Sequence, residues 1–158
     1  MPRTLLVFLA LSLGCAHRAD GGTAGTTGAA SASTPSAAIP VPPDLRRPSA
    51  DARTTPSGLT TKVLRPGAGR AHPGPKSRVT VHYVGWTVDG TQIDSTFARS
   101  APATFPLDAV IPGWTEGLQL MVVGEARRLW IPEHLAYKGK SGAPAGTLVF
   151  DVVLLGIE

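Results

Sequence analysis

The sequence is poor in cysteine, and it has no long apolar run. Cys15 is the only cysteine among 158 residues, so the chain cannot form an internal disulfide and packing alone must stabilise its fold. The apolar run from Leu5 to Leu13 is shorter than the roughly 20 residues that a helix needs to span a bilayer. The composition therefore favours a packed globular domain over a disulfide scaffold or a membrane-spanning helix.

Signals for metal, cofactor or nucleic-acid binding are also missing. Lys and Arg total 15 against 11 Asp and Glu, and the resulting charge of +4 is scattered along the chain. No basic patch is interleaved with aromatic residues, so we expect no nucleic-acid partner. No phosphate loop or nucleophile elbow occurs. We also expect no metal and no cofactor, because the four histidines lack ligand spacing: His17, His72, His82 and His134.

The first 14 residues, MPRTLLVFLALSLG, have a basic start, a short apolar stretch and small residues at the end, which predicts a signal peptide. Cys15 follows directly, and LSLGC resembles a bacterial lipobox, although Ser12 stands where a large aliphatic residue is usual. An ordinary cleaved signal is the alternative. We favour lipidation at Cys15, which would anchor the chain to a membrane without threading it through. The residues after Cys15, AHR, lack the inner-membrane retention signal, so we predict a periplasm-facing protein, with the outer membrane favoured.

The next segment has almost no large apolar residue. Residues 21–38 contain only Gly, Ala, Ser, Thr and Pro, which cannot form a core that would offset the entropy of ordering. Proline and polar residues continue to about Gly58. We therefore predict a signal peptide at 1–14, a lipidated flexible tether at 15–57 and one folded domain at 58–158.

Alternating apolar residues predict several strands within this domain. Residues 58–65 form a short strand that Pro66 and Gly67 end, and residues 78–87 alternate with the period of a half-buried strand. Asp89-Gly90 is a hairpin signal, so TQIDST should pair back. Further strands are expected in ATFPL, in ARRLWIP and in the run from Thr147 to Ile157.

One helix is predicted, at the stretch VIPGWTEGLQLM. Trp114, Leu118 and Met121 are spaced i, i+4 and i+7 and share one face. Pro112 is tolerated only at the first turn of a helix. Many strands with one short helix predict an α+β domain in which an antiparallel sheet packs on the helix.

Six phrases in this domain occur in a specific order: VHYVG, IDST, FPL, VIPGWTEGLQLM, LAY and TLVFDVVLL. Their order and spacing resemble the FKBP-type peptidyl-prolyl cis–trans isomerases, the macrolide-binding immunophilins, over about residues 58–158. The resemblance implies a five- or six-stranded antiparallel sheet wrapped around one short helix. It also implies noncovalent isomerisation of X–Pro bonds, without a metal or cofactor.

The resemblance assigns roles residue by residue. Trp114 would be the floor of a proline pocket, and Asp94 a carboxylate near the susceptible bond. Tyr137 and the backbone N–H of Ile111 would donate to substrate carbonyls. The implied catalytic set is Tyr83, Asp94, Ile111, Trp114, Tyr137 and Phe150, and the implied substrate-binding set is Ile93, Phe105 and Val110. Taken singly, each fits an ordinary core or turn position as well, and only the joint match favours a site.

Three features depart from the family pattern. Ile93 stands where phenylalanine is usual, Ala103 replaces an aromatic at the pocket rim, and the loop at 138–146 is several residues shorter. Two hypotheses follow: an isomerase that assists the folding of exported proteins, or a weakly catalytic module of the same fold that binds proline segments. The expected partners are proline-containing polypeptides, macrolide immunosuppressants as candidate ligands, and a membrane through the lipid anchor.

Overall fold

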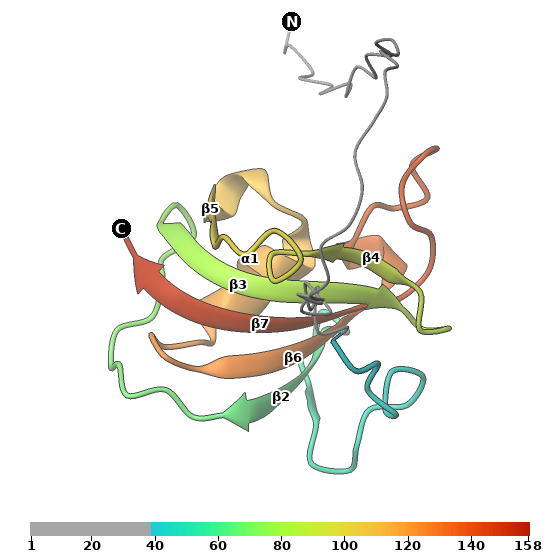
Figure 1. Cartoon of the computed structure of the whole chain (residues 1–158), viewed down its shortest axis with the longest axis horizontal. Coiled ribbons are helices and arrows are strands. Elements are labelled where there is room, and N and C mark those ends of the chain that lie inside the picture. The colour runs from blue at the N-terminus through green and yellow to red at the C-terminus, as the bar shows by residue number, and fades with distance from the viewer. Residues whose placement is uncertain (1–38) are drawn as a thin grey trace, which may run out of the picture. The chain divides into compact units, whose positions relative to one another are not determined.

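A seven-stranded antiparallel sheet forms the body of the protein in the computed structural model, which describes residues 39–158 (Figure 1). The strands are β1 (Arg53–Thr54), β2 (Thr60–Arg65), β3 (Arg78–Thr87), β4 (Gln92–Ser95), β5 (Ala103–Pro106), β6 (Ala126–Ile131) and β7 (Leu148–Ile157). Their order is β1-β2-β6-β7-β3-β4, and β5 pairs with β3 beside this path. The predicted α+β fold is confirmed, with one strand more than the six that the sequence predicted, because the two-residue strand β1 was not expected.

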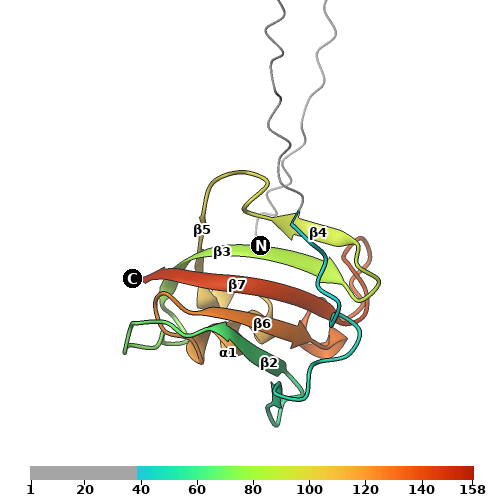
Figure 2. The same cartoon turned by 60° about the horizontal axis from the view of Figure 1, so that its bottom comes forward.

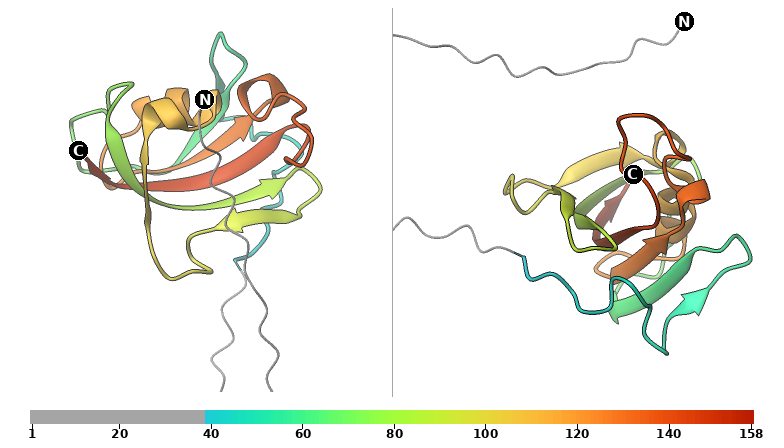
Figure 3. Two further views of the ribbon diagram at one scale, coloured as in Figure 1. Left: turned by 90° about the horizontal axis from the view of Figure 1, so that it is seen from above. Right: turned by 90° about the vertical axis from the view of Figure 1, so that its right-hand side faces the viewer.

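The long central strands β3 and β7 carry the predicted alternation. Val79, Val81 and Tyr83 of β3 are buried on the side of the sheet that contacts the helix, in register with the inward residues of β7. The inward residues of β7 are the four predicted to share one face: Leu148, Phe150, Val152 and Leu154. The left view of Figure 3 shows that this side of the sheet is concave and holds the helix.

Helix α1 (Pro112–Gln119) begins with Pro112 as its first residue, because proline needs no backbone N–H there. A Cβ at Gly113 would lie 2.4 Å from Ile131 Cγ2, and one at Gly117 would lie 2.8 Å from Leu129 Cδ1. These two glycines therefore let the helix approach β6 closely. Trp114, next to Gly113, is turned into the space enclosed by the sheet.

The other predicted inward residues of the helix, Leu118 and Met121, are fully buried, although Met121 lies just beyond the helix end. The Glu116 carboxylate accepts a hydrogen bond from the Ser57 hydroxyl at 2.6 Å. Two short 3-10 helices, η1 (Leu107–Ala109) and η2 (Glu133–Leu135), flank α1 and β6 along the chain. Within the described residues, no helix is long and apolar enough to cross a bilayer.

Residues 39–52, which we name the strap, cross the convex side of the sheet (Figure 2). Leu45 of the strap is only 3% exposed. It packs in a second small core with Val84, Trp86, Trp130 and Val149, which come from β3, β6 and β7. The expectation of a flexible tether up to residue 57 is therefore wrong for residues 39–57. Leu45 lies among prolines and polar residues with no apolar periodicity, so only its distant partners reveal that it is buried.

Polar contacts also hold the strap against the sheet. The indole Nε1 of Trp130 donates to the backbone oxygen of Asp44 at 3.1 Å. The Arg128 guanidinium donates to the carboxylate of Asp44 and makes two bonds, of 2.6 and 2.7 Å, to that of Asp151. Burial alone would lower the pKa of Arg128, but the two carboxylates raise it above its ordinary value, so the cation is retained. The expected signal peptide, Cys15 and residues 21–38 lie outside the described residues.

Candidate active site

A cavity of about 480 Å³ opens on the concave side of the sheet, beside the start of α1. This volume lies within the range typical of small-molecule and cofactor sites. The cavity is lined by Tyr83, Ile93, Asp94, Phe105, Ala109, Val110, Ile111, Trp114, Tyr137, Pro144 and Phe150. All nine residues that the sequence nominated for catalysis or substrate binding are therefore brought together around one space.

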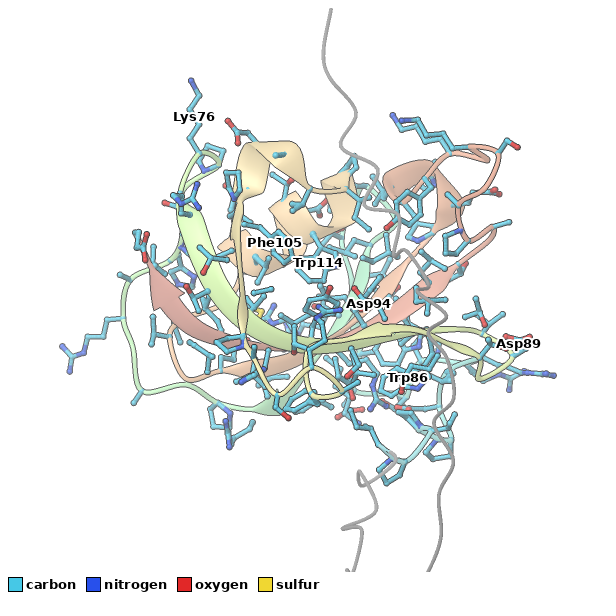
Figure 4. All side chains as sticks on the ribbon, turned by 45° about the horizontal axis from the view of Figure 1, so that its top comes forward. Lys76, Trp86, Asp89, Asp94, Phe105 and Trp114 are labelled. Carbon is cyan, nitrogen blue, oxygen red and sulfur yellow. The ribbon has the colours of Figure 1, made fainter. Side chains whose placement is uncertain are left out.

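The nine residues come from six separate parts of the chain. Strands β3, β4, β5 and β7 supply Tyr83, Ile93 with Asp94, Phe105 and Phe150. The segment from η1 into α1 supplies Val110, Ile111 and Trp114, and Tyr137 follows η2. Figure 4 shows Asp94, Phe105 and Trp114 close together on the helix side of the sheet, with Trp86 on the opposite side.

Three aromatic rings surround Trp114 edge to face. The rings of Tyr83, Phe105 and Phe150 have centroids 4.9, 5.8 and 5.4 Å from that of Trp114, at interplanar angles of 85–87°. Such T-shaped contacts suit the quadrupoles of aromatic rings. Trp114 is 5% exposed and still lines the cavity, so it forms a rigid, largely dry part of the cavity wall.

A β-bulge in β4 lets two consecutive residues face the cavity. Gly85 of β3 pairs with Asp94 and Trp86 pairs with Gln92, so Ile93 has no partner opposite it. In a regular strand, neighbouring side chains point to opposite faces, and a bulge re-aims one of them. The bulge thus explains how both Ile93 and Asp94 line the same space.

The Asp94 carboxylate is held by two donors at the edge of the cavity. The Tyr83 hydroxyl donates to Oδ2, and Arg99 Nη1 donates to Oδ1 at 2.5 Å. Partial burial alone would raise the pKa of Asp94, but hydrogen bonds from Tyr83 and Arg99 lower it below its ordinary value. Burial and the bond to Asp94 raise the pKa of Tyr83. At neutral pH the site therefore holds a carboxylate and a protonated phenol.

The other polar groups of the cavity are few. The backbone N–H of Ile111 donates to no acceptor within residues 39–158, while its carbonyl accepts from Trp114 N at 2.9 Å and so begins the helix. Tyr137, whose side chain carries a hydroxyl, also lines the cavity. In the same described region, no group of three or more His, Cys, Asp or Glu residues is arranged to hold a metal.

Sequence reasoning missed three participants. Arg99 donates to both Asp94 and Tyr83 from the connection between β4 and β5, and Ala109 and Pro144 line the cavity. Arg99 lies five residues after Asp94 in a polar stretch without periodicity, so no local signal marks it. Pro144 belongs to the shortened loop, which therefore still contributes to the wall.

Comparisons with known proteins agree with this geometry. The family model for FKBP-type peptidyl-prolyl cis-trans isomerases matches residues 69–155. FKBP-type peptidyl-prolyl cis-trans isomerase FkpA from Aeromonas hydrophila is 52% identical over 110 residues, covering 67% of this chain and 40% of that protein. Outer membrane protein MIP from Legionella longbeachae is 46% identical over 107 residues, covering 65% of this chain and 46% of that protein.

A solved structure is similar as well. The crystal structure of FkpA from Escherichia coli superposes with a TM-score of 0.65 at 41% identity, covering 70% of this chain and 53% of that chain. The chain thus spans about half the length of the relatives it matches. The matched region, residues 69–155, contains every residue that lines the cavity, from Tyr83 to Phe150. On the match of this region and the fold, the chain belongs to the FKBP-type peptidyl-prolyl cis-trans isomerase family.

Proposed function

We propose that this protein is an active peptidyl-prolyl cis–trans isomerase that assists the folding of exported proteins. The observation that carries the proposal is the convergence of all nine nominated side chains on one largely apolar cavity of about 480 Å³. The roles below are those that the geometry supports for each group.

Capture of the prolyl ring is the first task. Trp114 offers an apolar surface that its aromatic neighbours Tyr83, Phe105 and Phe150 hold in place. A prolyl ring packed against this wall would be fixed while the preceding residue turns. Binding energy from the ring is then used to orient the bond that rotates.

The apolar cavity would lower the barrier to rotation about the X–Pro bond. This barrier is about 18–20 kcal/mol in a peptide bond, because rotation removes the amide resonance. The same resonance separates charge between the oxygen and the nitrogen. The twisted state has less charge separation, so a water-poor environment disfavours it less than it disfavours the planar state. An enzyme gains rate only from such differences between the two states.

Three polar groups would hold the rest of the peptide. The free N–H of Ile111 and the hydroxyl of Tyr137 can donate to substrate carbonyls. Asp94 is ionised and acts as an acceptor, and its bonds to Tyr83 and Arg99 fix its position. None of these roles requires a covalent intermediate.

An isomerisation assay of the full chain on a short proline peptide tests the proposal. We expect the protein at micromolar concentration to accelerate exchange well above the uncatalysed rate. Saturable peptide binding without acceleration would instead identify the weakly catalytic binding module. Inhibition by a macrolide immunosuppressant is a separate expectation, since such a ligand would occupy the same cavity, and its affinity reports whether the short 138–146 loop still closes over a large ligand.

We further propose that the protein is a lipoprotein of the cell envelope, anchored through Cys15 and facing the periplasm. The signal-like residues 1–14 and the cysteine that follows support this, as does a relative named outer membrane protein MIP. Mass spectrometry of the mature N-terminus should find a lipidated cysteine. A Cys15→Ala variant that remains in the membrane fraction would argue against the anchor.

A further inference from the structure

Gly85 occupies the point where three strands meet beneath the cavity. It lies in β3, pairs with Phe150 of β7 on one side and with Asp94 of β4 on the other, and is buried. The bulge that frees Ile93 begins at the same residue. Gly85 does not appear among the cavity-lining residues, because it has no side chain to present.

Space, and not backbone conformation, requires glycine at this position. A Cβ added to Gly85 would lie 2.4 Å from Phe150 Cε1, 2.7 Å from Phe150 Cδ1 and 3.2 Å from Ile93 Cγ1. Its φ angle is outside the left-handed region, so any residue could adopt the backbone. The Phe150 ring therefore lies directly over Gly85, where every other residue has its Cβ.

A displaced Phe150 ring would have little room to move. Trp114 stands edge to face against it at 5.4 Å between centroids, and Tyr83 is tilted against it at 6.3 Å. A shift therefore either pushes the ring into the cavity or disturbs Trp114. Gly113 and Gly117 differ in this respect, because their close neighbours Ile131 and Leu129 belong to the core and do not line the cavity.

We propose that Gly85 is a positioning residue for the isomerase reaction: its missing side chain leaves room for Phe150 and Ile93 to lie against the backbone of β3, where they form the part of the cavity wall that takes the prolyl ring. This inference rests on the proposed isomerase function. Gly85 itself would not touch the substrate.

The test compares Gly85→Ala with Gly156→Ala in the full chain. Gly156 lies in β7 of the same sheet, and the nearest atom to a Cβ there is Thr80 Cβ at 3.9 Å, an ordinary contact. We expect Gly85→Ala to reduce kcat/KM about tenfold, mainly by raising KM, and Gly156→Ala to change it less than about twofold, since the contact at 156 requires no movement. Native activity in Gly85→Ala, at an unchanged KM, would overturn the proposal.

A double-mutant cycle with Phe150→Leu separates positioning from a general loss of stability. If Gly85 acts through the Phe150 ring, adding Gly85→Ala to Phe150→Leu should lower kcat/KM by less than about twofold. An equal loss in both backgrounds would overturn the proposal. Should Gly85→Ala alone fail to fold, the double variant decides, because recovery of the fold and of Phe150→Leu activity supports the ring contact and continued unfolding overturns it.

A structural readout keeps this inference separate from the proposed function. Ring resonances of Phe150 and the indole N–H of Trp114, followed by NMR, should shift in Gly85→Ala and stay in place in Gly156→Ala. If the native chain shows no isomerase activity, the proposed function fails, whereas unchanged resonances in Gly85→Ala contradict the positioning role even in an active enzyme.

Discussion

Tryptophan and other apolar side chains lie on both faces of the sheet, but they line an open cavity on one face and form a closed core on the other. On the concave face, Trp114 and four other aromatic residues line an open cavity. On the convex face, Trp86 and Trp130 form a closed small core with Leu45 of the strap. Strand β3 serves both faces, since Tyr83 points to one and Val84 and Trp86 to the other.

The difference lies in what covers each face. The strap lays Leu45 over the convex face and sets Asp44 against Arg128 of β6, so the apolar surface of this face is removed from water. Helix α1 covers only part of the concave face, and its abrupt start at Pro112 leaves the space beside Trp114 open. We therefore expect changes on the convex face to alter stability and changes on the concave face to alter activity.

The largest expected effect is on the convex face. Arg128→Met would leave the carboxylates of Asp44 and Asp151 without their cation, and loss of one partner from a buried ion group costs about 3 kcal/mol. Urea unfolding measures this loss. Arg78→Met is the control, because the Arg78–Glu158 pair is exposed and 4.0 Å long, and should cost under about 1 kcal/mol. Equal losses in both variants would refute the structural role of the Arg128 group.

Truncation within the strap should have the next largest effect. Leu45→Ala removes a side chain that is 3% exposed and should lower the free energy of unfolding by about 2–3 kcal/mol. The matched control is Val41→Ala, also in the strap but 53% exposed, with little expected change. Folded Leu45→Ala protein should keep kcat/KM within about twofold of the native value. A stable protein with lost activity would mean that the strap acts on the cavity.

A pair of tryptophan variants tests the comparison directly. Trp114→Leu should stay folded and lose about tenfold or more in kcat/KM, equivalent to about 1.4 kcal/mol of transition-state binding, because the wall for the prolyl ring is gone. Trp86→Leu removes an equally buried indole from the convex core and should reduce stability with activity retained. Full activity in Trp114→Leu would remove that residue from the site.

The smallest effect is expected at Asp94. Asp94→Asn weakens the bonds to Tyr83 and Arg99, and because the carboxylate is 44% exposed we expect a three- to fivefold loss in kcat/KM, equivalent to under about 1 kcal/mol. The folded-state pKa of Asp94 is lowered, so its contribution to stability is present above the ordinary pKa of about 3.9 and disappears as pH falls through the lower folded value.

The pH dependence of stability tests the ionised state of Asp94. The stability difference between native protein and Asp94→Asn should be constant from about pH 8 to pH 5 and shrink only below about pH 4. A difference that shrinks already between pH 7 and pH 5 would show that the carboxylate is not held ionised by Tyr83 and Arg99.

Local patterns predicted most of the fold. Alternation in residues 78–87 and 148–157 placed the two central strands, and the spacing of Trp114, Leu118 and Met121 placed the helix. The family resemblance nominated nine residues that the structure gathers around one cavity. Their assigned roles stay predictions until the variants are measured.

The sequence by itself determined which face of each central strand is buried and where the helix begins, because periodicity and proline act over a few residues. Only the tertiary structure decided that Ile93 and Asp94 face the same space, since that depends on a register shift against β3. It alone placed Leu45 in a core and Asp44 on Arg128, 84 residues away. Contacts between distant segments depend on how the whole chain folds, and no local pattern records them.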